Sequence, residues 1–181
     1  SSRELDEKLC SERSNAAACS PLVASLLLSR GIDDSEKARR FLHPRLVDLL
    51  DPEVLPEIDK AAERINKAIA GNESICVFGD YDVDGVTSTC LLLNFFQQVG
   101  KEVAYRLPDR FKGGYGLNCD MIKELAGDGI QLLITVDNGS SSQAEIALAA
   151  ELGMDVVGCD HHQPSEDSPK PIAHVERKTP R

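Results

Sequence analysis

Short apolar runs alternate with segments of helical spacing through the C-terminal two thirds of the chain. The apolar runs cover residues 75–79, 103–107, 131–136 and 155–159, and the helical segments cover residues 86–99, 119–127 and 141–152. Short strands that are apolar throughout are typical of a parallel sheet covered by helices on both faces. We therefore predict a doubly wound α/β domain with a mainly parallel sheet, in which residues 172–175 begin a fifth strand.

The preceding part of the chain has a different pattern. Residues 1–20 are polar and rich in Ser and Ala, and residues 21–47 read as short helices, with Gly31 ending one helix and Asp33-Asp34-Ser35 able to cap the next. A longer helix is predicted over about residues 58–70. We expect an N-terminal arm and small helical lobe over residues 1–56 and the α/β domain over residues 57–181.

Polar clusters follow each of the four predicted strands. In an open α/β sheet, ligands bind beyond the carboxyl ends of the strands, so clusters at four such ends should converge in space. The first strand is followed by Asp80, Asp82 and Asp84, the second by Arg110, the third by Asp137 and the fourth by Asp160, His161 and His162.

The acidic clusters predict a metal site. Carboxylates packed as closely as those of residues 80–84 repel one another, and a hard divalent cation would compensate them. Asp137, isolated on its own strand end, is the candidate bridge between two ions. We expect Asp82 and Asp84 to lie on one side of a tight turn at Gly85, each serving one ion, and the helix to open at Val86.

Each signal has a simpler interpretation when it is taken alone. Asp-x-Asp-x-Asp-Gly also opens an EF-hand loop, but the twelfth position counted from Asp80 is Leu91, where that loop needs a bidentate Glu. Asp137-Asn138-Gly139 alone is an ordinary turn sequence. A pair of histidines is more often a surface feature than a ligand pair. The order and placement of these signals together favour the metal site.

The loop over residues 110–116 carries two cations and three glycines. By composition alone a flexible turn is an equal alternative, but its place at a strand end favours a phosphate or sugar contact by Arg110 and stacking of a base on Tyr115.

Composition narrows the class of protein. The formal charge of −10 argues against a broadly basic nucleic-acid binder, although bound cations would reverse the sign of the charge locally. The six cysteines include no Cys-x-x-Cys pair, which favours reduced thiols. Neither a signal peptide nor a membrane span is recognisable, so a cytoplasmic location without membrane contact is expected.

The motif residues resemble the DHH phosphoesterase superfamily and, within it, the RecJ-type exonucleases that act on single-stranded DNA. Small-substrate members open with His-x-x-x-Asp-x-Asp, whereas Phe78 stands at the His position here and Asp80 is additional. The resemblance rests on the run from Val77 to Ser88, on residues 110–116, on Thr135 to Gly139, and on Asp160-His161-His162 with Pro164.

The resemblance implies a site that holds two Mn²⁺ or Mg²⁺ ions. Asp160 would support the ligands from behind, and Arg110, Tyr115 and His162 would contact the substrate. The implied metal ligands are Asp80, Asp82, Asp84, Asp137, His161 and His162, and all of them except Asp80 are also implied in catalysis.

Two functions from different classes follow. The first is a 5′→3′ exonuclease that degrades single-stranded DNA in repair or recombination, with other repair or replication proteins as further partners. The alternative is a truncated or degenerate relative that binds metal, nucleic acid or a replication partner without cleaving. The family has another metal-binding Asp and a second catalytic lobe further along the chain, and we expect this sequence to stop before them.

Overall fold

The computed structural model describes residues 18–49, 51–108, 116–162, 171 and 173–176. The chain forms two compact units, Ser1–Asp51 and Pro52–Arg181, which we describe separately. The predicted arm lies mostly outside the described residues, and so do Arg110 and Tyr115.

The first unit is a small helical one. Helices α2 (Pro21–Ser29) and α3 (Ser35–Leu42) are followed by a 3₁₀ turn, η1 (Leu46–Asp48). The Asp34 carboxylate accepts the backbone N–H groups of Glu36 at 2.6 Å and Lys37 at 3.2 Å, which confirms the predicted cap. Leu27 and Ala38 form its small core.

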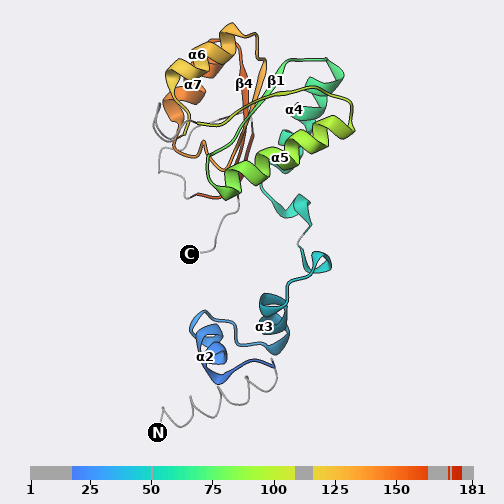
Figure 1. The fold of residues 1–181 in the computed structure, drawn as a ribbon, viewed down its shortest axis with the longest axis vertical. Coiled ribbons are helices and arrows are strands. Elements are labelled where there is room, and N and C mark those ends of the chain that lie inside the picture. The colour runs from blue at the N-terminus through green and yellow to red at the C-terminus, as the bar shows by residue number, and fades with distance from the viewer. Residues whose placement is uncertain (1–17, 50, 109–115, 163–170, 172, 177–181) are drawn as a thin grey trace. The chain divides into compact units, whose positions relative to one another are not determined.

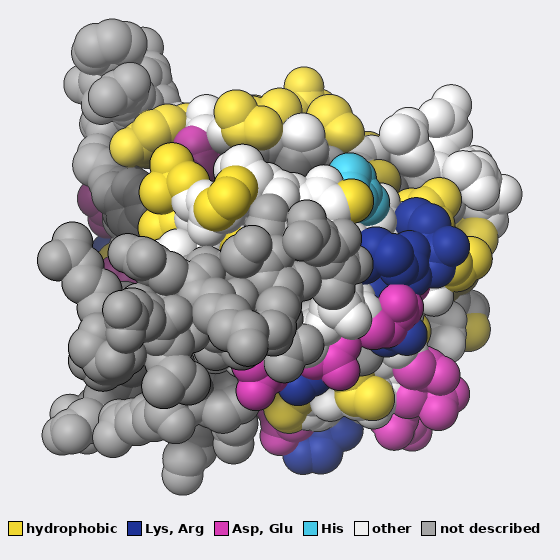
Figure 2. Space-filling model, turned by 90° about the horizontal axis from the view of Figure 1, so that it is seen from below, with side chains coloured by type: hydrophobic (Ala, Val, Ile, Leu, Met, Phe, Trp, Pro, Cys, Tyr) yellow, Lys and Arg dark blue, Asp and Glu magenta, His cyan; other side chains and the backbone are white. Residues whose placement is uncertain are grey.

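Charges of both signs are mixed on the described surface. In Figure 2, Lys and Arg side chains lie beside Asp and Glu side chains on the face shown. Within the first unit, Arg39 Nη2 lies 2.6 Å from Glu36 Oε1, and Arg45 Nε lies 2.8 Å from Asp48 Oδ2. These cations are therefore paired within their own unit.

The second unit contains a five-stranded parallel sheet with strand order β2-β1-β3-β4-β5 (Figure 1). The predicted parallel sheet and its fifth strand are both confirmed. The strands are β1 (Ile75–Phe78), β2 (Ala104–Arg106), β3 (Leu132–Val136), β4 (Asp155–Asp160) and β5 (Ala173–Glu176).

Helices cover both faces of this sheet, as Figure 1 shows. On one face, Ala61, Ala68 and Phe96 from α4 and α5 pack against alternate strand residues such as Val77 and Ile134. On the other face, α6 and α7 pack against the intervening strand positions. The central strands β1 and β3 are buried at every position because their successive side chains enter two different cores. The helices are α4 (Ile58–Ala70), which follows the 3₁₀ turn η2 (Pro52–Val54), α5 (Val83–Gln98), α6 (Cys119–Gly127) and α7 (Gln143–Glu151).

The strand order places a topological switch point at the carboxyl end of β1. The chain leaves β1 through α5 to β2 on one side, while β3 pairs with β1 on the other side. Segments that leave β1 and β3 diverge there and open a crevice, which is where doubly wound folds bind ligands.

Helix α5 begins three residues earlier than predicted. Asp82 is its N-cap, and the Asp82 carboxylate accepts the Gly85 N–H at 3.0 Å. Asp84 and Gly85 therefore lie in the first turn of the helix instead of in a separate tight turn. Gly85 permits a close approach of two backbone segments, because a Cβ at this position would overlap the backbone of Asp80.

We predict that Gly85→Ala destabilises the protein by about 2 kcal/mol, since the added methyl group forces α5 away from the Asp80 backbone. Urea unfolding measures the change. The matched control is Gly127→Ala on α6, where an added Cβ meets no atom within 4 Å and helix propensity favours Ala. Equal changes in the free energy of unfolding for the two substitutions would contradict the close approach of Gly85 to the Asp80 backbone.

Candidate metal centre

Asp80 lies directly beyond β1 and is only 1% exposed. Its Oδ1 accepts the N–H of Tyr81 at 2.7 Å, while its Oδ2 is buried without a hydrogen-bond partner. A buried carboxylate oxygen without a donor is costly unless a cation or a proton satisfies it.

Asp137 occupies the equivalent place beyond β3. Its backbone is left-handed, with φ of 60°, and its N–H donates to the carbonyl of Cys159 at 2.9 Å. The side chain is 4% exposed, and both carboxylate oxygens are buried without a hydrogen-bond partner. The fold therefore holds a buried carboxylate without hydrogen-bond donors at the switch point.

Asp82 brings a second negative charge to Asp137. Burial raises the pKa of the Asp137 carboxyl, and the neighbouring Asp82 carboxyl raises it further, although the two imidazoles oppose this. The Gly85 N–H lowers the pKa of the exposed Asp82 carboxyl, which keeps that partner ionised. The repulsion between the Asp82 and Asp137 carboxylates favours binding of a cation between the two side chains.

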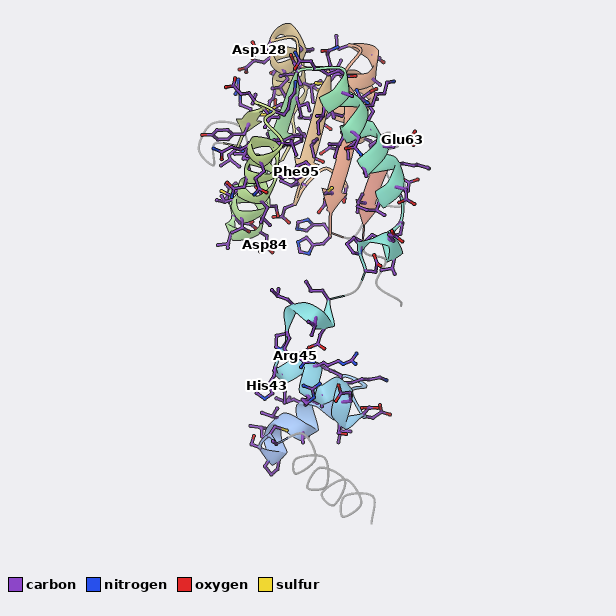
Figure 3. The ribbon with its side chains drawn as sticks, turned by 90° about the vertical axis from the view of Figure 1, so that its right-hand side faces the viewer. His43, Arg45, Glu63, Asp84, Phe95 and Asp128 are labelled. Carbon is purple, nitrogen blue, oxygen red and sulfur yellow. The ribbon has the colours of Figure 1, made fainter. Side chains whose placement is uncertain are left out.

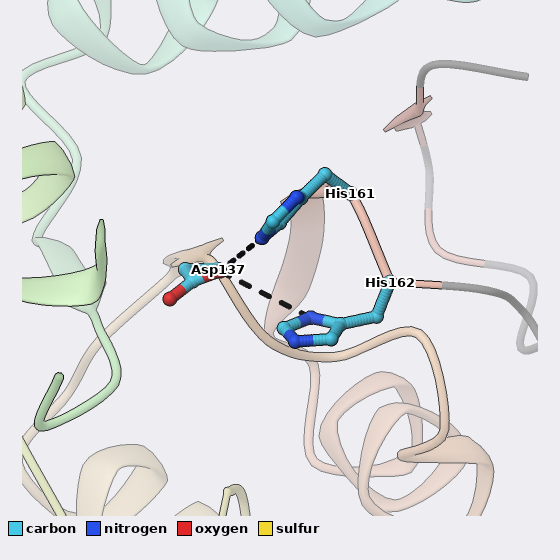
Figure 4. A group of neighbouring side chains, drawn as sticks. All are labelled: Asp137, His161 and His162. Atoms are coloured by element: carbon cyan, nitrogen blue, oxygen red, sulfur yellow. Dashed lines mark ion pairs between the residues drawn. The ribbon is translucent and has the colours of Figure 1, made fainter. Parts of the chain in front are cut away.

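Two imidazoles approach Asp137 from the end of β4 (Figure 4). His161 Nε2 lies 3.0 Å from Asp137 Oδ1, without the alignment of a hydrogen bond, and His162 Nδ1 lies 4.0 Å from the same oxygen. His161 Nε2 is thus directed to the carboxylate that lacks a donor, whereas His162 Nδ1 lies nearer to Asp160 Oδ1, at 2.7 Å. Imidazole nitrogens and carboxylate oxygens are ligands that Mn²⁺ accepts.

Asp160 organises this pair of histidines. Its Oδ1 accepts the N–H groups of His161 at 2.8 Å and His162 at 3.1 Å, and lies 2.7 Å from His162 Nδ1. Its Oδ2 accepts the Ser140 N–H at 3.0 Å. Burial raises the pKa of the Asp160 carboxyl, but these hydrogen bonds outweigh burial and hold it at about 2, and they raise the pKa of His162.

Asp137 belongs to two groups of possible ligand atoms. One group consists of Asp137, His161 and His162, and the other of Asp80, Asp82 and Asp137, with the ligand atoms of each group within 4.8 Å of one another. The buried oxygens of Asp80 and Asp137 that lack hydrogen-bond donors also need a cation or a proton to satisfy them. The residues present therefore fit a pair of divalent ions that share Asp137.

The remaining sequence candidates divide into two sets. Asp84 belongs to neither ligand group among the described residues. It is exposed in the first turn of α5, where Figure 3 labels it. It does line the same hollow as Asp137 and His161. Arg110 and Tyr115 lie outside the described residues.

Two further residues position the centre and were not predicted from the sequence. Asn138 donates from Nδ2 to the carbonyl of Val136 at 2.9 Å and to that of Phe78 at 3.4 Å, so it joins the ends of β3 and β1. Ser140 holds Asp160 through its backbone N–H. The sequence signals only the turn, because Asp-Asn-Gly favours left-handed backbone conformations. Asp137 and Gly139 both have positive φ in the structure.

Comparisons with known proteins find one family. Residues 74–180 match the model of the DHH family, N-terminal domain. The chain is 45% identical over 160 residues to the single-stranded-DNA-specific exonuclease RecJ of Bacillus subtilis (88% of this chain, 20% of that protein). It is 35% identical over 150 residues to the Escherichia coli protein of the same name (82% and 25%).

Two solved structures are similar as well. A structure of exonuclease RecJ bound to manganese matches with a TM-score of 0.65 and 31% identity over 71% of this chain and 33% of that one. RecJ from Thermus thermophilus in complex with Mn²⁺ matches with a TM-score of 0.67 and 27% identity over 93% and 23%. The chain thus spans a third or less of the length of these relatives.

We predict that Asp137→Asn stabilises the metal-free protein at pH 7. The folded-state pKa of Asp137 is raised, so its ionised form costs stability as pH rises above the unfolded-state value, and Asn removes that charge. Asn also tolerates the left-handed backbone. Thermal unfolding in EDTA measures this change.

The same substitution should remove the stabilisation by Mn²⁺. We expect about 2.7 kcal/mol for the wild type at a Mn²⁺ concentration 100 times the Kd. The control Asp128→Asn, at the end of the unit far from Asp84 (Figure 3), should retain it. An unchanged Mn²⁺ response in Asp137→Asn would contradict the assignment.

We predict that Asp160→Asn costs about 2 kcal/mol at pH 7 in EDTA, because the ionised carboxylate accepts several N–H groups. The folded-state pKa is lowered to about 2, so the carboxylate contributes fully above the unfolded-state pKa, and its contribution is lost as pH falls from about 4 towards 2. Urea unfolding at several pH values should show the two proteins converging in acid. A constant difference would contradict this role.

Proposed function

The chain belongs to the DHH family, and on that premise we propose that it is the metal-binding part of a phosphodiester hydrolase, a 5′→3′ exonuclease on single-stranded DNA of the RecJ type. The observation that carries the proposal is Asp137, a buried carboxylate without donors that two groups of possible metal ligands share. Similarity to manganese-bound exonucleases supports it.

Most of the proposed metal ligands come from the two groups of neighbouring side chains. Asp80, Asp82, Asp137, His161 and His162 would hold two Mn²⁺ or Mg²⁺ ions. Bound ions would supply Lewis acidity towards the phosphate and a water of lowered pKa. We retain Asp84 as a proposed ligand for a conformation in which it turns into the hollow that it lines.

Asp160 would act through the histidines. Because it accepts two consecutive backbone N–H groups and approaches His162 Nδ1, it would hold the backbone of both histidines and orient the imidazole of His162. His162, held in this way and nearly half exposed, would also be placed to meet a substrate phosphate. Arg110 and Tyr115 stay predictions for phosphate contact and base stacking.

The proposal extends to the organisation of the protein. We propose residues 57–181 as the DHH domain and residues 1–56 as its helical lead. The chain matches only 20–28% of the length of five curated RecJ relatives, so the activity of those whole proteins is only a proposal for this chain.

Substrate and location follow the same proposal. Single-stranded DNA is the proposed substrate, with repair or replication proteins as further partners and the cytoplasm as the proposed location. Among the residues that the structure describes, every helix is too short or too polar to cross a bilayer.

Degradation of labelled oligonucleotides tests the function. With Mn²⁺, the protein should release labelled mononucleotide first from a 5′-labelled single strand and only later from a 3′-labelled one, and a blunt duplex should persist. Asp137→Asn should lower the rate by at least about 10³-fold, a scale typical of lost charge stabilisation in a transition state.

Asp128→Asn is the matched control and should cleave at the wild-type rate. Folded protein that binds Mn²⁺ and degrades no single strand would contradict exonuclease activity of this chain. That result would instead favour the binding protein that does not cleave. Equal cleavage by Asp137→Asn would contradict the proposed site.

A further inference from the structure

A hollow of about 360 Å³ adjoins the candidate metal centre. The charged and imidazole side chains that line it are Asp84, Asp137, Asp160 and His161. Asp137 and His161 belong to the groups of possible metal ligands, so a group bound by the metal ions would face into the hollow. Its size falls at the lower end of the range for small-molecule sites, about 300–1,000 Å³. The hollow is therefore large enough for more than the phosphate that a metal pair would hold.

Leu55, Cys159 and Val175 form an apolar wall in this hollow. Leu55 precedes α4 and packs against the core under α4 and α5, while Cys159 and Val175 are register partners on β4 and β5. Three separate segments thus converge to present apolar side chains beside a cluster of charges. Phosphate or metal alone would leave this wall in contact with water.

Hydroxyl groups line the hollow from α5. Thr87 and Ser88 lie in the second turn of that helix, and the Thr87 hydroxyl donates to the carbonyl of Val83 at 2.7 Å. The hollow therefore combines three surfaces: a metal-binding end, an apolar wall and a hydroxyl-bearing wall. A matching ligand carries an anionic group, a flat or apolar body, and polar oxygens along one side.

We propose that this hollow binds the nucleoside attached to the phosphate at the metal centre, with the apolar wall of Leu55, Cys159 and Val175 against the base or the carbon face of the deoxyribose. The inference rests on the proposed function, which supplies the nucleotide. It adds a role for Leu55 in positioning the substrate. Thr87 and Ser88 would face the sugar oxygens.

Calorimetry with the wild-type chain in the presence of Mn²⁺ tests this. The two probes are inorganic phosphate and thymidine 5′-monophosphate, which differ by the nucleoside. We expect the nucleotide to bind at least about tenfold more tightly than phosphate, which is the scale of a single good apolar contact.

Leu55→Ala should weaken nucleotide binding about tenfold and leave the affinities for phosphate and Mn²⁺ unchanged. Leu55→Met, which keeps the apolar volume, should restore nucleotide binding. Leu152→Ala removes an exposed leucine next to α7, on the other face of the sheet, and should behave as the wild type.

Two results would overturn the inference while leaving the metal centre intact. The first is equal affinity of the wild type for phosphate and nucleotide. The second is unchanged nucleotide binding in folded Leu55→Ala. Loss of nucleotide, phosphate and Mn²⁺ binding together in Leu55→Ala, with no rescue in Leu55→Met, would mean that Leu55 serves only the fold. Absence of Mn²⁺ binding in the wild type would contradict the proposed function itself.

Discussion

The buried carboxylate of Asp137 is the constraint on which the site depends. Both of its oxygens lack hydrogen-bond donors, and Asp82 adds a like charge nearby. In an ordinary core such a group would be replaced or neutralised, because burying an uncompensated charge costs several kcal/mol. Here the sheet, the left-handed backbone and the Asn138 link between strand ends all maintain it. The folded protein thus bears the free-energy cost of burying this carboxylate, and a bound cation would remove that cost.

Most of the architecture could be predicted from the chain because the strands enter two cores. Residues 75–78 and 132–136 are apolar at nearly every position, and this is the pattern of a sheet covered on both faces. The gathering of Asp80, Asp137 and the two histidines followed from their places after successive strands. Topology alone brings such residues together, so local sequence order was sufficient for that prediction.

The features that the sequence did not predict correctly depend on tertiary contacts, which the pattern of apolar and polar residues does not encode. Helix α5 starts earlier than the sequence predicts because Asp82, a predicted metal ligand, also caps the helix. Gly85 was assigned to a turn, whereas it permits contact with the Asp80 backbone. The backbone N–H of Ser140 and the meeting of Leu55 with Val175 involve residues 20 and 120 positions from their partners, so they required the folded chain.

The central claim is that Asp137 is shared by two metal ions, and electron paramagnetic resonance of the protein titrated with Mn²⁺ tests it most directly. We predict two ions per chain with the spectrum of a magnetically coupled pair, since ions that share a carboxylate lie roughly 3.5–4 Å apart. Asp137→Asn should leave at most one ion, uncoupled. A single uncoupled Mn²⁺ in the wild type, or a coupled pair that persists in Asp137→Asn, would contradict the claim.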